Sequence, residues 1–127
     1  MQQKYLFEYA VIRIVPKVER EEFLNAGVIL YCAKPPFLQL RFKVSPEKVR
    51  AFCDELDMPG LIDNLHAMER ICAGEPAAGP IGKLDPASRF RWLTATRSTV
   101  VQTSKVHPGF CNDPGETLTR LYNQLVL

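Results

Sequence analysis

Three apolar segments within the first 44 residues have the composition and periodicity of β-strands, and all three precede any helical pattern. Residues 5–15 and 23–32 are rich in β-branched and aromatic side chains, and the first segment ends at Pro16. Residues 37–44 alternate, with Leu38, Leu40, Phe42 and Val44 on one side and Gln39, Arg41 and Lys43 on the other. Because the connections are short, this order predicts an antiparallel meander whose third strand has one solvated side.

The rest of the chain carries helix signals with defined starts. Ser45 followed by Pro46 is typical of a helix N-terminus, and Asp113 with Glu116 three residues later forms a capping-box pattern. Apolar stripes predict helices after Ser45, over 61–72, over 85–93 and after Asp113, with a long loop at 74–86, a strand at 98–105 and a turn at 106–109. We therefore expect a single α+β domain over 1–127, an antiparallel sheet of about four strands with helices packed on one face.

Composition and charge fit one globular domain and favour no partner class. The 127 residues are 46% hydrophobic and 24% charged, with a formal net charge of +2. Residues 1–80 hold 10 basic and 11 acidic side chains (net −1), and residues 81–127 hold 6 and 3 (net +3). That mild asymmetry fits either a nucleic-acid partner or a solvated face. The four cysteines and two histidines are scattered, so we expect no metal site and no cofactor.

Targeting and membrane signals are not apparent in the sequence. The N-terminal region lacks a basic stretch followed by an apolar run and a cleavage site. No apolar stretch approaches the roughly 20 residues of a spanning helix. We expect a cytoplasmic protein without a membrane partner.

No strong catalytic motif is present, and the richest chemical signal is the segment 88–109. It places Arg89, Arg91 and Arg97 around the single tryptophan, Trp92. Arginines in such a group can form a pocket for phosphate or carboxylate. The alternative is a set of surface arginines around one anchoring tryptophan.

Further candidate ligand-binding residues come from the strands. Arg13 interrupts one face of the first strand, and Gln102 belongs to the hydroxyl-rich fourth strand. Gly27 predicts a bulge or a close backbone approach, or else a gap that gives a ligand access to the Asn25 amide. His107 is a weak candidate for a general base, because no orienting carboxylate is identified.

The chain resembles the bacterial domain of unknown function 3037 family in segments spread over nearly its whole length. The resemblance lies in Tyr9, Arg13, Pro16, Glu22-Phe23, Asn25, Gly27-Val28, Arg89-Phe90, Arg97-Ser98, His107 and Gly109, in this order. It gives weight to Arg13, Glu22, Asn25, Gly27, Arg97, Ser98 and His107 as one constellation. It also implies a HipA-like kinase as a partner, and it implies no catalytic residue.

These observations leave three hypotheses about function. The leading one is a non-enzymatic interaction or accessory module for the kinase-like partner. The alternative is a small enzyme or sensor that binds a phosphorylated ligand or nucleic acid through Arg13, Arg89, Arg97 and His107. The third is a homodimer formed through an exposed sheet edge.

Overall fold

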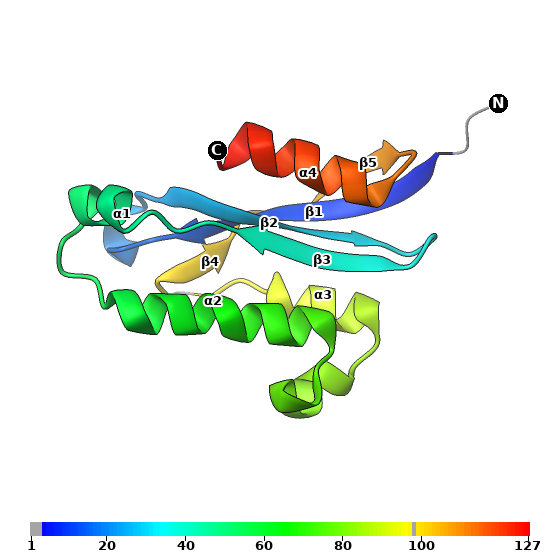
Figure 1. Cartoon of the computed structure of the whole chain (residues 1–127), viewed down its shortest axis with the longest axis horizontal. Coiled ribbons are helices and arrows are strands. Elements are labelled where there is room, and N and C mark those ends of the chain that lie inside the picture. Colours follow the sequence, from blue (N-terminus) through cyan, green and yellow to red (C-terminus); the bar gives the residue numbers. More distant parts are fainter. Residues whose placement is uncertain (1–3, 98) are drawn as a thin grey trace.

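The predicted N-terminal meander forms the centre of the protein (Figure 1). In this computed structural model, which describes residues 4–97 and 99–127, β1 (Tyr5–Ile14), β2 (Leu24–Cys32) and β3 (Phe37–Phe42) pair antiparallel in chain order. A register shift between Ile12 and Arg13 marks a bulge in the β1–β2 pair. The bulge falls beside Gly27, where the sequence predicted an irregularity.

The free edge of β1 is occupied by two short strands placed end to end. β4 (Val101–Thr103) pairs with the C-terminal part of β1, and β5 (His107–Cys111) pairs with its N-terminal part. The sheet thus has five strands within the described residues, where about four were predicted. The predicted turn at 106–109 is wrong, because His107, Pro108 and Gly109 lie in β5. Pro108 is tolerated there since β5 is an edge strand.

The helices begin close to where the sequence signals place them. They are α1 (Pro46–Phe52), α2 (Met58–Ala73), α3 (Pro86–Leu93) and α4 (Pro114–Leu125), with 3₁₀ segments η1 (Val18–Arg20) and η2 (Pro76–Lys83). Ser45, Asp57 and Asp113 each accept a hydrogen bond from a first-turn N–H of the helix that follows. Asp85 precedes α3 without such a bond, and η2 occupies most of the predicted loop at 74–86.

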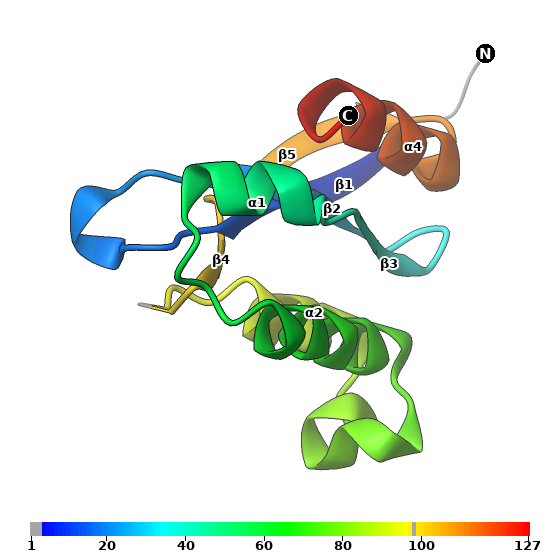
Figure 2. The same cartoon turned by 60° about the vertical axis from the view of Figure 1, so that its left-hand side comes forward.

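Helices cover both faces of the sheet, which corrects the prediction that they pack on one face (Figures 1 and 2). On one face, α2 and α3 bury a cluster that includes Ala10, Ile12, Ile14, Ile29, Leu65, Met68, Phe90 and Leu93. On the other, α4 buries Phe7, Val28, Leu30, Cys32, Leu118 and Leu121. The reason is β2, whose apolar run over 26–32 supplies both faces at once. The α+β class and the antiparallel sheet are confirmed.

Candidate functional site

Three of the predicted ligand-binding residues lie side by side across the sheet. Arg13 on β1 is opposite Asn25 on β2 and Gln102 on β4. The Arg13 guanidinium stacks 4.0 Å above the Phe23 ring, and within the described residues its Nε is buried without a hydrogen-bond partner. Both amides are occupied by backbone carbonyls: Asn25 donates to Leu125 O at 3.0 Å, and Gln102 donates to a carbonyl three residues earlier. Of this trio, only Arg13 has a buried side-chain nitrogen without a hydrogen-bond partner among the described residues.

The remaining predicted residues lie elsewhere. Arg97 donates to the carbonyls of Leu93 and Trp92 and stacks 4.4 Å from the Trp92 ring, so it closes the end of α3. α3 packs on the face of the sheet opposite Arg13, so these two arginines do not share a pocket. Glu22 pairs with Arg20 beside η1. Ser98 lies outside the described residues.

His107 lies on β5 opposite Tyr9, with the two ring centres 5.3 Å apart. Tyr9 precedes Arg13 by four residues along β1, a separation of about 13 Å at 3.3 Å per residue. Among the described residues no carboxylate contacts the His107 imidazole. His107 therefore has neither a carboxylate that would orient it as a general base nor the arginine that was expected beside it.

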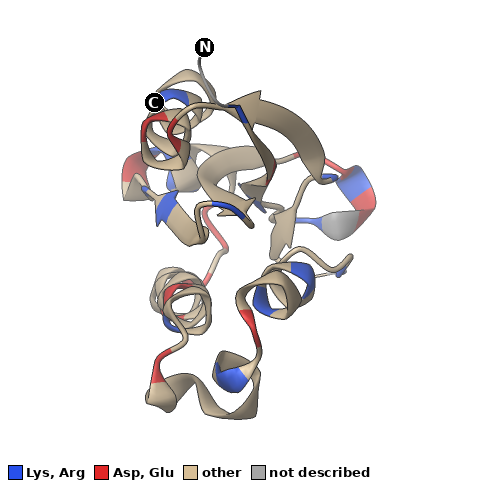
Figure 3. Cartoon of the chain, turned by 90° about the vertical axis from the view of Figure 1, so that its right-hand side faces the viewer, with Lys and Arg blue, Asp and Glu red and all other residues tan. Residues whose placement is uncertain are grey.

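The arginines of α3 are also engaged by the protein itself. Arg91 makes two hydrogen bonds to the Glu8 carboxylate, at 2.7 and 2.8 Å, and these bonds lower the pKa of Glu8 below its ordinary value of 4.5. Arg89 donates to Leu84 O at 2.6 Å. The arginine pocket expected around Trp92 is therefore dispersed. Figure 3 shows Lys and Arg interspersed with Asp and Glu over both helical layers.

The space beside Gly27 is filled by β3. A Cβ at Gly27 would lie 2.4 Å from the carbonyl oxygen of Arg41 and 2.9 Å from Phe42 Cβ. Such separations are far below van der Waals contact, so this position requires glycine. The prediction of a close backbone approach is confirmed, and the alternative of a ligand gap at Gly27 is wrong.

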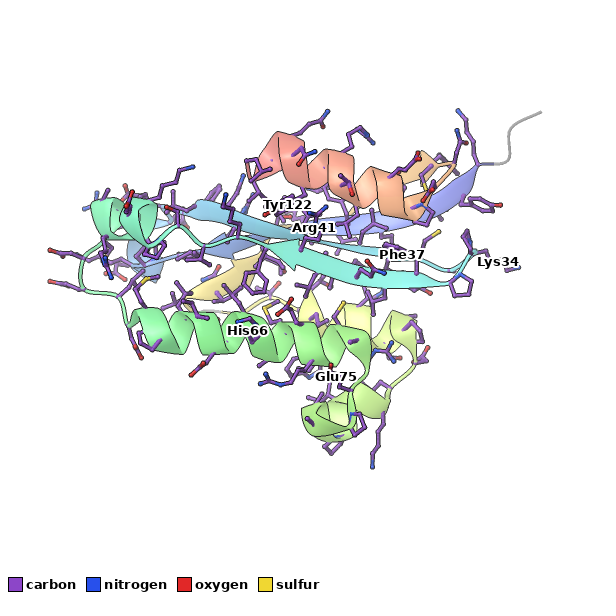
Figure 4. The ribbon with its side chains drawn as sticks, in the orientation of Figure 1. Lys34, Phe37, Arg41, His66, Glu75 and Tyr122 are labelled. Carbon is purple, nitrogen blue, oxygen red and sulfur yellow. The ribbon has the colours of Figure 1, made fainter. Side chains whose placement is uncertain are left out.

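The outer edge of β3 is a candidate site that no sequence pattern predicted. A groove of about 550 Å³ runs along this edge between β3 and α2. We call it the β3 groove; its lining residues are Leu38, Gln39, Leu40, His66, Glu69, Arg70, Cys72, Ala73 and Glu75. Figure 4 looks onto the edge, with Arg41 and Tyr122 on the α4 side and His66 and Glu75 on the α2 side.

The hydrogen-bond pattern shows which backbone groups of β3 face outward. Lys43 N donates to Ala26 O at 2.8 Å, and the register places Arg41 opposite Val28. Hydrogen-bonded pairs recur every second residue in an antiparallel ladder, so Gln39, Arg41 and Lys43 bond to β2. Leu38, Leu40 and Phe42 therefore direct their N–H and C=O groups away from the sheet. Within the described residues, β3 has no strand partner on that side.

The two sides of this edge differ in chemistry. Toward α2, half-buried Leu38 and Leu40 adjoin the buried thiol of Cys72, whose pKa is raised by burial to about 12 and which is therefore uncharged. On the same side, His66 Nδ1 lies 2.7 Å from the Glu69 carboxylate. Toward α4, Arg41 donates to Thr119 Oγ1 at 3.2 Å and lies 4.7 Å from the Tyr122 ring centre.

Comparison with protein families places this chain in one of them. The family model described as "Protein of unknown function (DUF3037)" matches residues 9–126. The chain belongs to the DUF3037 family. No curated protein and no solved structure matched it.

In this DUF3037 chain, several residues that carry the family resemblance stabilise the fold. Gly27 admits the β3 backbone, Asn25 holds the end of α4, and Arg97 closes α3. Among the described residues, no group of three or more His, Cys, Asp or Glu side chains is arranged to hold a metal ion. No helix in the described part of the chain is long and apolar enough to cross a membrane.

Proposed function

We propose that this DUF3037 protein is an interaction module that binds one extended segment of a partner protein as an added strand on β3. The observation that carries this proposal is the open β3 edge, where three residues direct backbone donors and acceptors outward beside a groove. Peptide binding by strand addition needs this combination: main-chain groups give affinity and adjoining pockets give selectivity. The partner we would test first is the HipA-like kinase that the family resemblance implies.

A second copy of the chain fits this edge less well than a lone segment. Joined strands lie about 4.8 Å apart, whereas packed helices need about 8–10 Å between their axes. The C-terminal half of α2 lines the β3 groove, and His66 reaches the Phe42 ring at 5.5 Å. Two copies paired through β3 would therefore bring their α2 helices too close, while an isolated strand carries no helix.

Co-expression with the kinase-like protein, followed by size-exclusion chromatography with light scattering, tests the proposal. We expect one heteromeric peak, which Leu40→Pro abolishes because proline removes an outward-facing N–H while the bonds to β2 remain. Leu40→Ala is the matched control, since it shortens the same side chain and keeps the N–H. Thermal unfolding of both variants verifies that they fold.

The proposal fails if the two wild-type proteins elute separately at micromolar concentration, or if Leu40→Pro and Leu40→Ala retain the partner equally. It also fails if the wild-type chain alone is a dimer that Leu40→Pro converts to a monomer, because a second copy would then occupy β3.

A second candidate function is binding of an anionic ligand at Arg13, favoured by its buried, unpartnered Nε among the described residues. A fluorescent nucleotide is a suitable probe. If phosphates contact Arg13, Arg13→Gln should weaken binding while Arg97→Gln does not, and affinity should fall with salt. Equal affinity of the wild type and Arg13→Gln would remove this candidate.

A further inference from the structure

The residues on the two sides of β3 indicate which side chains the bound partner segment carries, in addition to its extended conformation. We infer that the segment bound at the β3 groove alternates acidic and aliphatic residues, with the acidic side chains toward α4 and the aliphatic ones toward α2. This inference rests on the proposed strand addition. It concerns the side chains of the partner, whereas the proposed function concerns its backbone.

The α4 side of the edge is cationic. Side chains alternate along a strand, so Arg41 and Lys43 project to the same side, about 6.6 Å apart. Both are exposed, and within the described residues no carboxylate lies within ion-pair distance of either one. The contacts of Arg41 with Thr119 and Tyr122 hold its guanidinium along the edge without neutralising its charge. Two acidic side chains of an added strand, two residues apart, can therefore each meet one cation.

The α2 side is apolar at its base and carries carboxylates at its rim. Leu38 and Leu40 are half-buried beside the uncharged Cys72 thiol, so aliphatic side chains gain contact there. Glu69 and Glu75 line the same side and would repel an acidic residue. Arg70, also in this lining, disfavours a basic residue, and Glu69 is already paired with His66. An aliphatic residue is the choice that opposes none of these charges.

Fluorescence anisotropy with synthetic peptides and the full chain tests the inference. The probes are fluorescein-labelled octapeptides: one alternates Glu and Val, one alternates Lys and Val, and one has four Glu followed by four Val. We expect the alternating Glu–Val peptide to bind about tenfold more tightly than the other two, because only it matches both sides. Arg41→Glu should abolish the preference for Glu–Val over Lys–Val, because it leaves one cation, Lys43, and one carboxylate on that side. Lys105→Glu, the same change of charge at an exposed position near the opposite edge, should leave the preference unchanged.

Backbone methylation separates this inference from the proposed function. Residues of an added strand direct their N–H groups alternately toward β3 and away from it. Methylating the nitrogens of only the Glu residues, or of only the Val residues, should abolish binding in one case and preserve it in the other. If both methylated peptides bind like the parent, strand addition is refuted and the inference falls with it. If one pattern abolishes binding but Lys–Val binds as tightly as Glu–Val, or Arg41→Glu leaves the preference unchanged, strand addition stands and the acidic–aliphatic pattern is wrong.

Discussion

Gly27→Ala is the sharpest test of how closely β2 and β3 approach. The new Cβ would meet the Arg41 carbonyl oxygen at 2.4 Å, with Phe42 Cβ at 2.9 Å and Phe42 Cα at 3.1 Å. The nearest atom belongs to the backbone, so no rotamer change relieves the clash and the two strands must separate locally. Overpacking of this kind costs about 1–3 kcal/mol, and a strained ladder hydrogen bond adds about 1 kcal/mol.

Alanine also restricts the unfolded chain more than glycine does, and this offsets about 0.4–1 kcal/mol of the loss in stability. We therefore expect the free energy of unfolding to fall by about 2–3 kcal/mol, and Tm to fall by roughly 8–12 °C for a domain of this size. Urea titration followed by circular dichroism measures the loss, and an unchanged m-value would show that the unfolding transition is comparable.

Gly115→Ala is the matched control for this experiment. Its Cβ would meet Asp113 Oδ1 at 3.3 Å and a Phe37 ring carbon at 3.8 Å, near ordinary contact, and alanine is favoured within a helix. We expect its stability to lie within about 0.5 kcal/mol of the wild type. A Gly27→Ala variant equally close to the wild type would refute the close approach of the β3 backbone. It would also reopen the gap beside Gly27 as a site for a ligand.

Three further predictions concern groups that the protein itself engages. Because Arg91 lowers the pKa of Glu8 below 4.5, the pair stabilises the fold above that pH. In urea titrations at pH 7, the free energy of unfolding of Arg91→Gln should be about 0.5–1 kcal/mol lower than that of the wild type. This difference should vanish as the pH falls below the lowered pKa of Glu8. An unchanged deficit at pH 3 would contradict this. Burial raises the pKa of Cys72 to about 12, so mass spectrometry should show it unmodified by Ellman's reagent until the protein unfolds. Arg97→Ala should increase acrylamide quenching of Trp92 fluorescence, because the guanidinium shields that ring; identical quenching would contradict the stacked geometry.

Local signals made the N-terminal meander and the helix starts predictable. Alternation in residues 37–44 fixed the sides of β3, and the Ser45 and Asp113 patterns placed the starts of α1 and α4. β5 was missed because a Pro-Gly pair is typical of a turn, and only pairing with β1 shows that it lies on an edge. The helical layer formed by α4 was missed because Arg13, in the first strand, suggested that this face of the sheet is open to solvent. The apolar run of β2 was the signal for it.

The candidate site was harder to predict because partners distant in sequence decide which polar groups remain available. Arg91 is paired with Glu8, which lies 83 positions away, and Asn25 is held by a carbonyl 100 positions away. Nothing near these residues in the sequence indicates either contact. The strand register places Arg13 beside Asn25 and Gln102. Arg97 instead lies at the end of α3, and His107 lies on β5. An open edge is likewise a property of the assembled sheet, so no local pattern in β3 indicates it.

The two edges of the sheet differ in a way that bears on what β3 can bind. The β4–β5 edge is interrupted, since β4 is three residues long, the Lys105 carbonyl accepts a hydrogen bond from the Ser104 hydroxyl, and Pro108 has no N–H to offer. Short strands and proline are the usual protections against edge-to-edge association. β3 is a continuous six-residue strand with neither proline nor glycine, so its protection must come from its surroundings. The α2 helix beside it obstructs a second sheet that carries its own helix, but it leaves room for a single strand. In the proposed function, this arrangement limits aggregation through β3 and keeps its backbone groups available to one extended segment.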